Sequence, residues 1–271
     1  MEKVLKWFVA FFLIINTTNS MAQKPMDVKM LSSKVDSLLA EANEVYSLLY
    51  AALTAEKIAT NQINLKYKWV LEIYSKDSIE IKFLNDQKII ITSMTFLDNY
   101  TKPKIKNNLR QSLSNYEDSL FDIKRQFFAK IDSSKYIINP NDSIKHVTLM
   151  IPFEVYYKIY QIRATNKENI IPFGGDKLYV INKNSELLIS KTFHTNYIPM
   201  KTIVRGHKVR HVVPKYTDNE TYILPVDIAL FRYYADDREL NSLTVFPPRS
   251  KRYFSYNSKL NKLRVHTTPS N

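Results

Sequence analysis

Apolar residues recur at steps of three and four along the chain after Pro25. The positions that follow this rhythm are Val28, Leu31, Val35, Leu38, Ala42, Val45, Leu49 and Ala52. Such spacing places them on one face of an α-helix, and neither Gly nor Pro interrupts the chain from there to Gln62. The pattern predicts one long amphipathic helix of about 30 residues.

The period then changes from helical to alternating. Apolar side chains alternate with other residues in two short runs, and a third apolar run follows the Asn85-Asp86 turn signal. The alternating positions are Trp69, Leu71 and Ile73, then Ile79, Ile81 and Phe83, and the third run is Ile89 to Ile91. Alternation is typical of strands, so the sequence predicts a three-stranded antiparallel meander over 67–97.

A second helical rhythm begins after Pro103. Its apolar positions are Ile105, Leu109, Leu113, Tyr116, Leu120, Ile123 and Phe127. The alternation over seven residues resembles a coiled-coil seam, which predicts a helix over 103–132 that packs along the first one. The same seam, with the small residues Ala51, Ala52 and Ala55 of the first helix, is a candidate surface for homo-oligomers.

The segment 133–145 is rich in turn residues, and the chain after it has mostly strand patterns. One helix interrupts them, beginning at Pro225 and continuing to Tyr234 before Asp236-Asp237. The strand candidates are 146–164, 177–182, 187–193, 209–213, 243–246, 252–256 and 262–266. The predicted fold class is α+β: a long N-terminal helix pair carrying a small antiparallel meander, then a mostly antiparallel sheet domain with one inner helix.

The first 22 residues have the pattern of a secretory signal peptide. Lys3 and Lys6 precede the apolar run Trp7 to Ile15, and Ser20-Met21-Ala22 supplies the small residues that signal peptidase requires. The apolar run is too short for a membrane span of about 20 residues. We therefore expect cleavage after Ala22, export to the periplasm or cell surface, and no transmembrane span afterwards; an uncleaved anchor is the alternative. The predicted domains are 1–22, 23–132 and 133–271.

Composition narrows the chemistry that this chain can perform. With no Cys, thiolate zinc sites, disulfides and cysteine nucleophiles are excluded. The chain has 3 Gly and lacks a phosphate-binding glycine loop, a G-x-S-x-G elbow and an H-E-x-x-H motif. We therefore expect a non-enzymatic binding or interaction protein without a cofactor. Its composition, with abundant Lys, Asn and Ile, resembles that of secreted envelope proteins from bacteria with low-GC genomes.

The net charge of +13 is concentrated in two basic stretches. The first runs from Lys201 to Lys215 without an acid, and the second begins at Arg249 and leads into aromatic residues. The candidate anion-binding residues are Lys201, Arg205, Lys208, Arg210, Lys215, Arg249, Lys251 and Arg252. Cations interleaved with aromatics suit anionic glycans, lipid head groups or nucleic acid. Export argues against nucleic acid and favours an anionic envelope ligand or an envelope protein; the structural alternative is a solvated hairpin face.

Three of the five histidines, His194, His207 and His211, lie close together in the sequence. If 207–213 is a strand, His207 and His211 share a face but lie about 13 Å apart. One zinc ion cannot bridge that gap, because each Zn–N bond is about 2.0–2.1 Å long. Isolated surface or turn histidines are the structural alternative.

The segment 176–265 resembles the JAMM/MPN metalloprotease fold. The resemblance rests on the hairpin KLYVINKNSELLISKTFH, on His211-Val212-Val213-Pro214 and on TYILPVDI, in which Asp227 enters a helix. It implies zinc, with His211 as the first ligand, Asp227 as the third and His194 as a further candidate; Glu154 is the nearest match to the general base. The resemblance implies a metal-dependent hydrolase or, because Val213 stands at the second histidine position and removes a ligand, its inactive descendant. The last alternative is a structural subunit that oligomerises through its long helices, including 103–132.

Overall fold

The computed structural model of the chain describes residues 28–63, 65–75, 77–97, 102–131, 144–216, 222–248 and 250–267, with side chains from Ser33 onward. The chain divides into two compact units, Met1–Asp36 and Ser37–Asn271. The described sheets all belong to the second unit. The signal peptide predicted for 1–22 lies outside the described residues.

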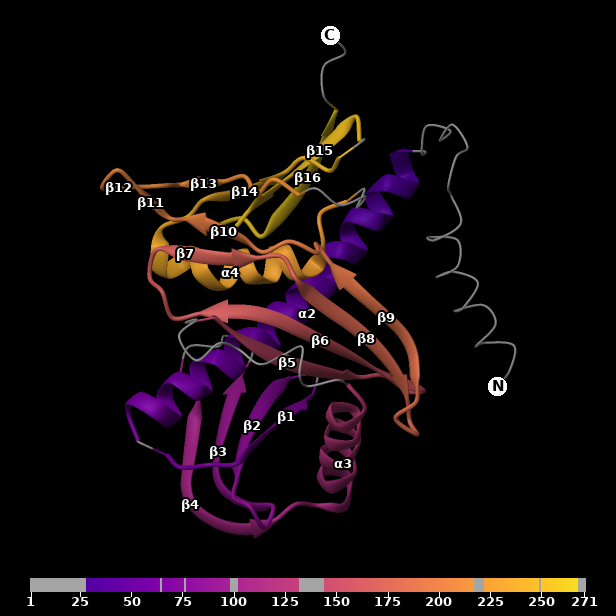
Figure 1. Ribbon diagram of the computed structural model, residues 1–271, viewed down its shortest axis with the longest axis vertical. Coiled ribbons are helices and arrows are strands. Elements are labelled where there is room, and N and C mark those ends of the chain that lie inside the picture. The colour runs from indigo at the N-terminus through magenta and orange to yellow at the C-terminus, as the bar shows by residue number, and fades with distance from the viewer. Residues whose placement is uncertain are drawn as a thin grey trace. The chain divides into compact units, whose positions relative to one another are not determined.

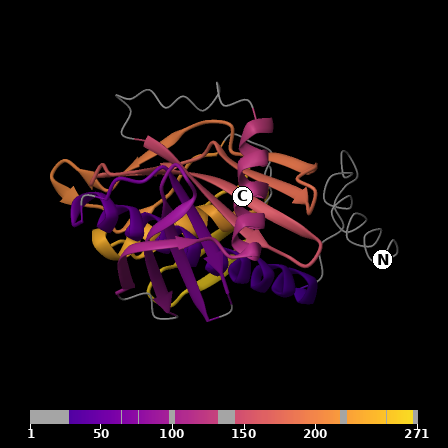
Figure 2. The ribbon, with the colours of Figure 1, turned by 90° about the horizontal axis from the view of Figure 1, so that it is seen from below.

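The first sheet has the strand order β1-β2-β3-β4, and all its pairs are antiparallel (Figures 1 and 2). Its strands are β1 (Trp69–Tyr74), β2 (Ser78–Leu84), β3 (Ile89–Leu97) and β4 (Lys104–Ser112). The three-stranded meander predicted over 67–97 is confirmed as β1 to β3. The long helix predicted before it corresponds to α2 (Val28–Asn61).

The helix predicted over 103–132 is wrong in its first half, where the chain forms β4. The Ile105 and Leu109 spacing spans too few residues to fix a helix, and Asn107-Asn108 are poor helix formers. Asn108 has a φ of 57°, and the register with β3 shifts beside it, so the strand bulges there. The helix α3 (Asn115–Lys130) begins only after Ser114, which forms a capping box with Glu117.

The central sheet has the antiparallel order β5-β6-β8-β9. Its strands are β5 (Ile144–Pro152), β6 (Tyr156–Thr165), β8 (Asp176–Asn182) and β9 (Leu187–Phe193). The single strand predicted over 146–164 is two strands, because the chain turns after Pro152 and the Phe153 N–H donates to the Tyr156 carbonyl. Beside this sheet, β7 (Ile170–Phe173) pairs with β10 (Ile198–Lys201).

The C-terminal sheet has the order β13-β14-β15-β16, with β13 parallel to β14 and the other pairs antiparallel. Its strands are β13 (His211–Val212), β14 (Ser242–Val245), β15 (Arg252–Asn257) and β16 (Lys262–Thr267). A short hairpin, β11 (Ile203–Val204) and β12 (His207–Lys208), precedes it, and α4 (Pro225–Arg238) lies between β13 and β14 in the chain. Helix α4 continues past Tyr234, where the sequence predicted its end. The fold class is α+β, as predicted.

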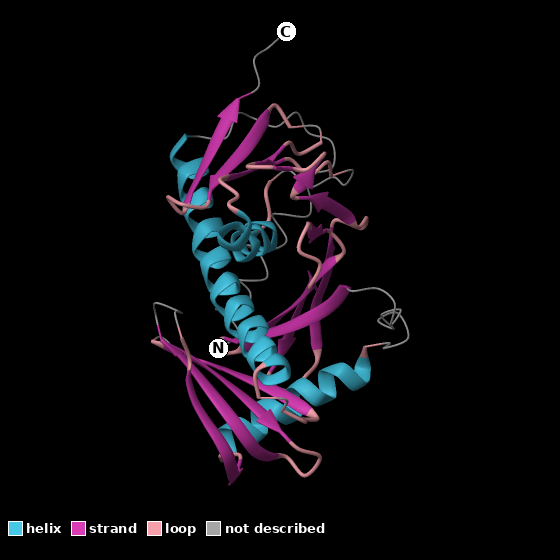
Figure 3. Ribbon diagram, turned by 90° about the vertical axis from the view of Figure 1, so that its left-hand side faces the viewer, coloured by secondary structure: helices cyan, strands magenta, loops and turns pink. Residues whose placement is uncertain are grey.

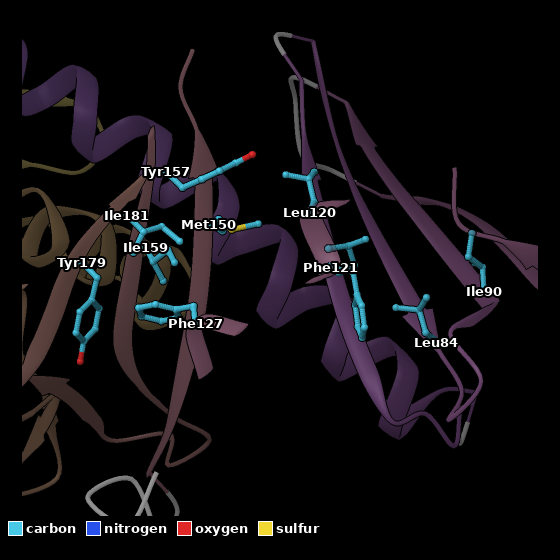
Figure 4. Packing of buried hydrophobic residues seen from close by; sticks show 11 residues of the cluster. Leu84, Ile90, Leu120, Phe121, Phe127, Met150, Tyr157, Ile159, Tyr179 and Ile181 are labelled. Carbon is cyan, nitrogen blue, oxygen red and sulfur yellow. The ribbon is translucent and has the colours of Figure 1, made fainter. Parts of the chain in front are cut away.

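The central sheet buries both of its faces against helices. On one face, Phe127 of α3 packs edge-on against Tyr179 of β8, with 5.0 Å between ring centroids. Figure 4 shows Phe127 directed toward Ile159 of β6, while Phe121 of the same helix lies toward Leu84 of β2. Helix α3 therefore joins the first sheet and the central sheet in one buried cluster. This cluster crosses the domain boundary predicted at 132/133, which itself stays a prediction.

Helix α2 contacts the other face of the central sheet with the residues that follow Asp36. The Tyr160 hydroxyl of β6 donates to Glu41, and Arg232 of α4 donates to Asn43 across 2.8 Å. Ala42, Ala51, Ala55 and Ala59 are all 0% exposed. Figure 3 shows the length of this helix. Its small residues therefore contact elements of the same chain. Among the described helices, none combines the length and the hydrophobicity that crossing a membrane requires.

Candidate functional site

Two adjacent glycines position a buried polar cluster at the start of β8. Gly174 and Gly175 have φ values of 82° and 76°, in the left-handed region that L side chains avoid. A Cβ atom at Gly174 would lie 2.1 Å from the Asn196 carbonyl oxygen. The Gly175 N–H donates to the His194 carbonyl. This close approach brings Asp176 and His194 into the same region of the interior.

Asp227 has hydrogen-bond partners on both carboxylate oxygens. Its Oδ1 accepts from the Tyr216 hydroxyl at 2.8 Å, and its Oδ2 lies 3.2 Å from His194 Nε2. The same Oδ2 accepts from the Leu224 N–H, one of the backbone donors at the start of α4. The His194 and Tyr216 rings stack, with an interplanar angle of 6°. Asp227 thus connects the start of α4 with Tyr216 and His194, which precede it by 11 and 33 residues.

Burial perturbs the two ionisable groups beside this carboxylate. Desolvation raises the pKa of Asp176 to about 7, and the nearby Asp227 charge acts in the same direction. One Asp176 oxygen accepts from the Arg163 N–H, and the other has no hydrogen-bond partner among the described residues. Burial, followed by the Asp227 charge, raises the pKa of Tyr216 well above its ordinary value.

The burial of this cluster favours a structural role over a catalytic one. Asp176 and Asp227 are 0% exposed, His194 is 2% exposed and Tyr216 is 6% exposed. A catalytic acid or base must come within hydrogen-bond reach of its substrate, and the two carboxylates are fully buried while His194 and Tyr216 are nearly so. Perturbed pKa values also arise in structural networks. We interpret the cluster as a clamp that holds the start of α4.

The structure separates the residues that the metalloprotease resemblance would bring together. Asp227 and His194 lie in the buried cluster, whereas His211 is exposed on β13 with its Nδ1 2.7 Å from Ser242 Oγ. Glu154 is exposed in the turn between β5 and β6. Within the described ranges, no three His, Asp or Glu side chains come together as a metal-binding group.

The predicted anion-binding residues divide into two groups. Lys201, Arg205, Lys215 and Lys251 are exposed, and Arg252 is half-buried. Lys208 forms an ion pair with Glu239, whose pKa the lysine lowers, and Arg210 lines a surface pocket together with Asp236 and Glu239. Lys208 and Arg210 therefore face carboxylates of this chain. Arg249 lies outside the described residues.

A second surface follows from the register of the C-terminal sheet. Leu243, Val245, Phe254 and Tyr256 are buried on one face, where Tyr256 contacts Phe231 of α4. The alternate residues point to the opposite face, which we call the outer face. Its residues are His211, Ser242, Thr244, Phe246, Tyr253, Ser255, Asn257, Lys262, Arg264 and His266. All ten are exposed or half-buried, and none is an acid.

The outer face combines a row of rings, two serine–histidine pairs and two cations. Phe246, Tyr253 and His266 stack in a row across three neighbouring chain segments, with centroid distances of 5.0 and 4.6 Å. Ser255 Oγ lies 2.7 Å from His266 Nε2, which repeats the serine–histidine pairing of Ser242 and His211. Lys262 and Arg264 add two exposed cations on β16. Aromatic rings, hydroxyls, imidazoles and cations are thus gathered on one carboxylate-free face.

Sequence reasoning missed most of this surface, although two signals were present. Lys262, Arg264 and His266 alternate with Leu263 and Val265, which predicts one polar face on that strand. The chain from Leu240 to its last residue contains no Asp or Glu. Sequence reasoning singled out the basic residues 249–252 but assigned no role to His266. The strand register that joins His266 to Tyr253 and Ser255 is not visible in the sequence.

No protein-family model matches this chain, and neither a curated protein nor a solved structure is significantly similar to it. The resemblance to the JAMM/MPN fold has no support from these comparisons.

Proposed function

We propose that this chain is an exported, non-enzymatic binding protein of the bacterial periplasm or cell surface that holds an anionic ligand on the outer face. The observation that carries the proposal is the absence of carboxylates among the ten outer-face residues, which include Lys262 and Arg264. A surface of one charge sign attracts ligands of the other sign. The exposed Lys201, Arg205, Lys215 and Lys251 add to the positive field of this part of the chain.

The two alternatives receive less support from the geometry. A metal-dependent hydrolase of the kind implied by the resemblance would need His211 beside Asp227, but Asp227 has its partners in the buried cluster. A subunit that oligomerises through the predicted long helices would need free helical faces. Ala51, Ala55 and Leu120 are instead buried within the chain, and 104–112 is a strand.

The test compares the dextran sulfate affinity of two double variants, each of which replaces two cationic side chains with glutamine. The double variant Lys262→Gln/Arg264→Gln removes both outer-face cations, and Lys104→Gln/Lys106→Gln removes two exposed cations from β4. Binding of dextran sulfate to the mature chain is measured by calorimetry at low and at physiological ionic strength. We expect the affinity to fall steeply with salt, because screening weakens exposed charge pairs.

The outer-face variant should lose most of the affinity, while the β4 variant should keep it. Equal losses in the two variants would show a response to net charge alone and would contradict the outer face as the site. Absence of dextran sulfate binding at low ionic strength would contradict the proposal as a whole.

A further inference from the structure

In the aromatic row of the outer face, the middle ring is covered and the ring at one end is exposed. Tyr253 of β15 lies between Phe246, which follows β14, and His266 of β16, at interplanar angles of 25° and 10°. Both faces of the Tyr253 ring are therefore covered by neighbouring rings. Phe246 is 49% exposed and is the most exposed ring of the row. The row offers a ligand the Phe246 ring at one end and a series of ring edges, instead of separate open platforms.

This arrangement favours a sugar over a run of nucleic-acid bases. Single-stranded nucleic acid binds by stacking successive bases on separate aromatic side chains, whereas Phe246, Tyr253 and His266 stack on one another. The ring face of Phe carries the negative part of its quadrupole, and the C–H groups on one side of a sugar ring can lie against it. A single accessible ring suits one sugar residue of a polysaccharide.

The two serine–histidine pairs supply hydrogen bonds beside the ring row. In each pair, either the hydroxyl donates to the imidazole or the imidazole donates to the hydroxyl. In the first case a neutral imidazole carries its proton on the other ring nitrogen, and in the second case the hydroxyl proton is available. Either way, each pair keeps one donor for a further acceptor. His211–Ser242 and His266–Ser255 therefore suit a ligand with many oxygen atoms.

The cations of the outer face select a ligand with negative charge. Arg264 lies directly opposite Ser255 in the register, and Lys262 lies opposite Asn257. Both are on β16, two residues apart and on the same face, at a spacing of about 6.6 Å. A guanidinium group binds a carboxylate through two parallel hydrogen bonds. The face thus combines cations for carboxylates, donors for hydroxyls and one ring for a sugar.

We propose that the outer face binds an acidic polysaccharide, with a sugar ring against Phe246 and its carboxylates at Arg264 and Lys262. This inference rests on the proposed function and narrows the anionic ligand to a carboxylated glycan. A nucleic acid or a lipid surface carries its negative charge on phosphates, whereas an acidic polysaccharide carries carboxylates on hydroxyl-rich sugar rings, which suit the guanidinium group, the serine–histidine pairs and the Phe246 ring. Those two ligands are therefore outcomes of the test.

The experiment measures binding of polygalacturonate to the mature chain at physiological ionic strength by calorimetry. Arg264→Gln should weaken binding about tenfold, which equals about 1.4 kcal/mol, because it removes a charge-assisted contact with a carboxylate. Phe246→Ala should weaken it severalfold, while Phe246→Tyr, which keeps the ring, should bind as the unmodified chain does. Lys104→Gln is the matched charge control and should leave binding unchanged. Thermal unfolding of each variant checks that the exposed substitutions leave the fold intact.

Each other outcome has a defined meaning. Binding of polygalacturonate that is insensitive to Phe246→Ala would contradict the sugar contact with that ring. Equal binding of uncharged dextran would contradict the requirement for an acidic polysaccharide. Either result would overturn the inference. Tighter binding of a thymidine oligonucleotide, or of phosphatidylglycerol vesicles, would overturn it in favour of that ligand. If dextran sulfate binds through Lys262 and Arg264 but polygalacturonate does not bind, the glycan inference fails and the proposed function stands. If neither binds, both fail.

Discussion

At the scale of single residues, Asp176 is an ionisable carboxyl group held in the protein interior. It is 0% exposed, and one carboxylate oxygen lacks a hydrogen-bond partner in the described part of the chain. An unfolded Asp has a pKa near 3.8, and burial raises the pKa of Asp176 to about 7. Between these two values the folded chain holds a proton that the unfolded chain releases. The stability that this proton provides is complete below the unfolded pKa and is lost as pH rises through about 7.

We therefore expect the free energy of unfolding to fall between about pH 4 and about pH 7, by roughly a few kcal/mol from this group. Asp176→Asn keeps an acceptor for the Arg163 N–H and stays neutral, so its unfolding should depend less on pH. Urea denaturation at several pH values measures the difference. Asp237→Asn, at an exposed position of α4, is the matched control and should retain the full pH dependence. The same pH dependence in Asp176→Asn as in Asp237→Asn would contradict the assignment.

At the scale of elements, the sequence predicted best where one strand face is buried. Apolar residues alternate with other residues in β1, β2 and β16, and burial alternates at the starts of β2, β3 and β16, so these strands were found from the pattern. Strand β4 is an edge strand, exposed along nearly its whole length, and no alternation is imposed on it. Its Lys104, Lys106 and Arg110 are typical of an edge protected from further pairing. Chance helical spacing therefore dominated the prediction there.

The bulge of β4 at Asn108 can be tested by mutation. Its φ of 57° suits Asn or Gly, whereas a β-branched side chain is strained in this region. Asn108→Val should lower the free energy of unfolding by about 1–2 kcal/mol, and Asn108→Gly should be near neutral. Lys106→Val, on the same exposed strand but at a position without a positive φ, is the control and should cost nothing. Chemical denaturation measures all three, and equal stability of the Val and Gly variants at 108 would argue against the bulge.

At the scale of the whole molecule, local patterns cannot show which elements meet. The outer face depends on the pairing of β13 with β14 across the entire length of α4, and the buried clamp depends on His194 reaching Asp227. Both contacts join residues more than thirty positions apart. The histidines were therefore grouped by sequence distance, although His194 is buried and His211 is exposed. Composition did anticipate one property of the site, the excess of cations over acids.

The long-range contacts also bear on the domain boundary predicted at 132/133. Phe127, before the boundary, packs against Tyr179, after it, and Lys130 donates to the Ser185 carbonyl across 2.9 Å. Helix α2 adds the ion pair of Glu41 with Lys158 on the other face of the same sheet. A fragment ending at 132 would thus expose the apolar side of α3, and a fragment beginning at 133 would expose both faces of the central sheet. Exposed apolar area of this kind costs about 25 cal/mol per Å².

We expect that 23–132 and 133–271, produced separately, each lack a cooperative thermal transition, and that mixing them restores the near-ultraviolet circular dichroism of the intact chain. Phe127→Ala in the intact chain isolates one contact between the halves and should cost about 3–5 kcal/mol. Phe128, the 36% exposed neighbour on the same helix, is the matched control, and its replacement by Ala should cost far less. A 133–271 fragment that unfolds cooperatively alone, at the midpoint of the intact chain, would instead make the halves independent domains. In that case the outer face could be studied without α2 and α3, since β13 to β16 and α4 all lie in the second fragment.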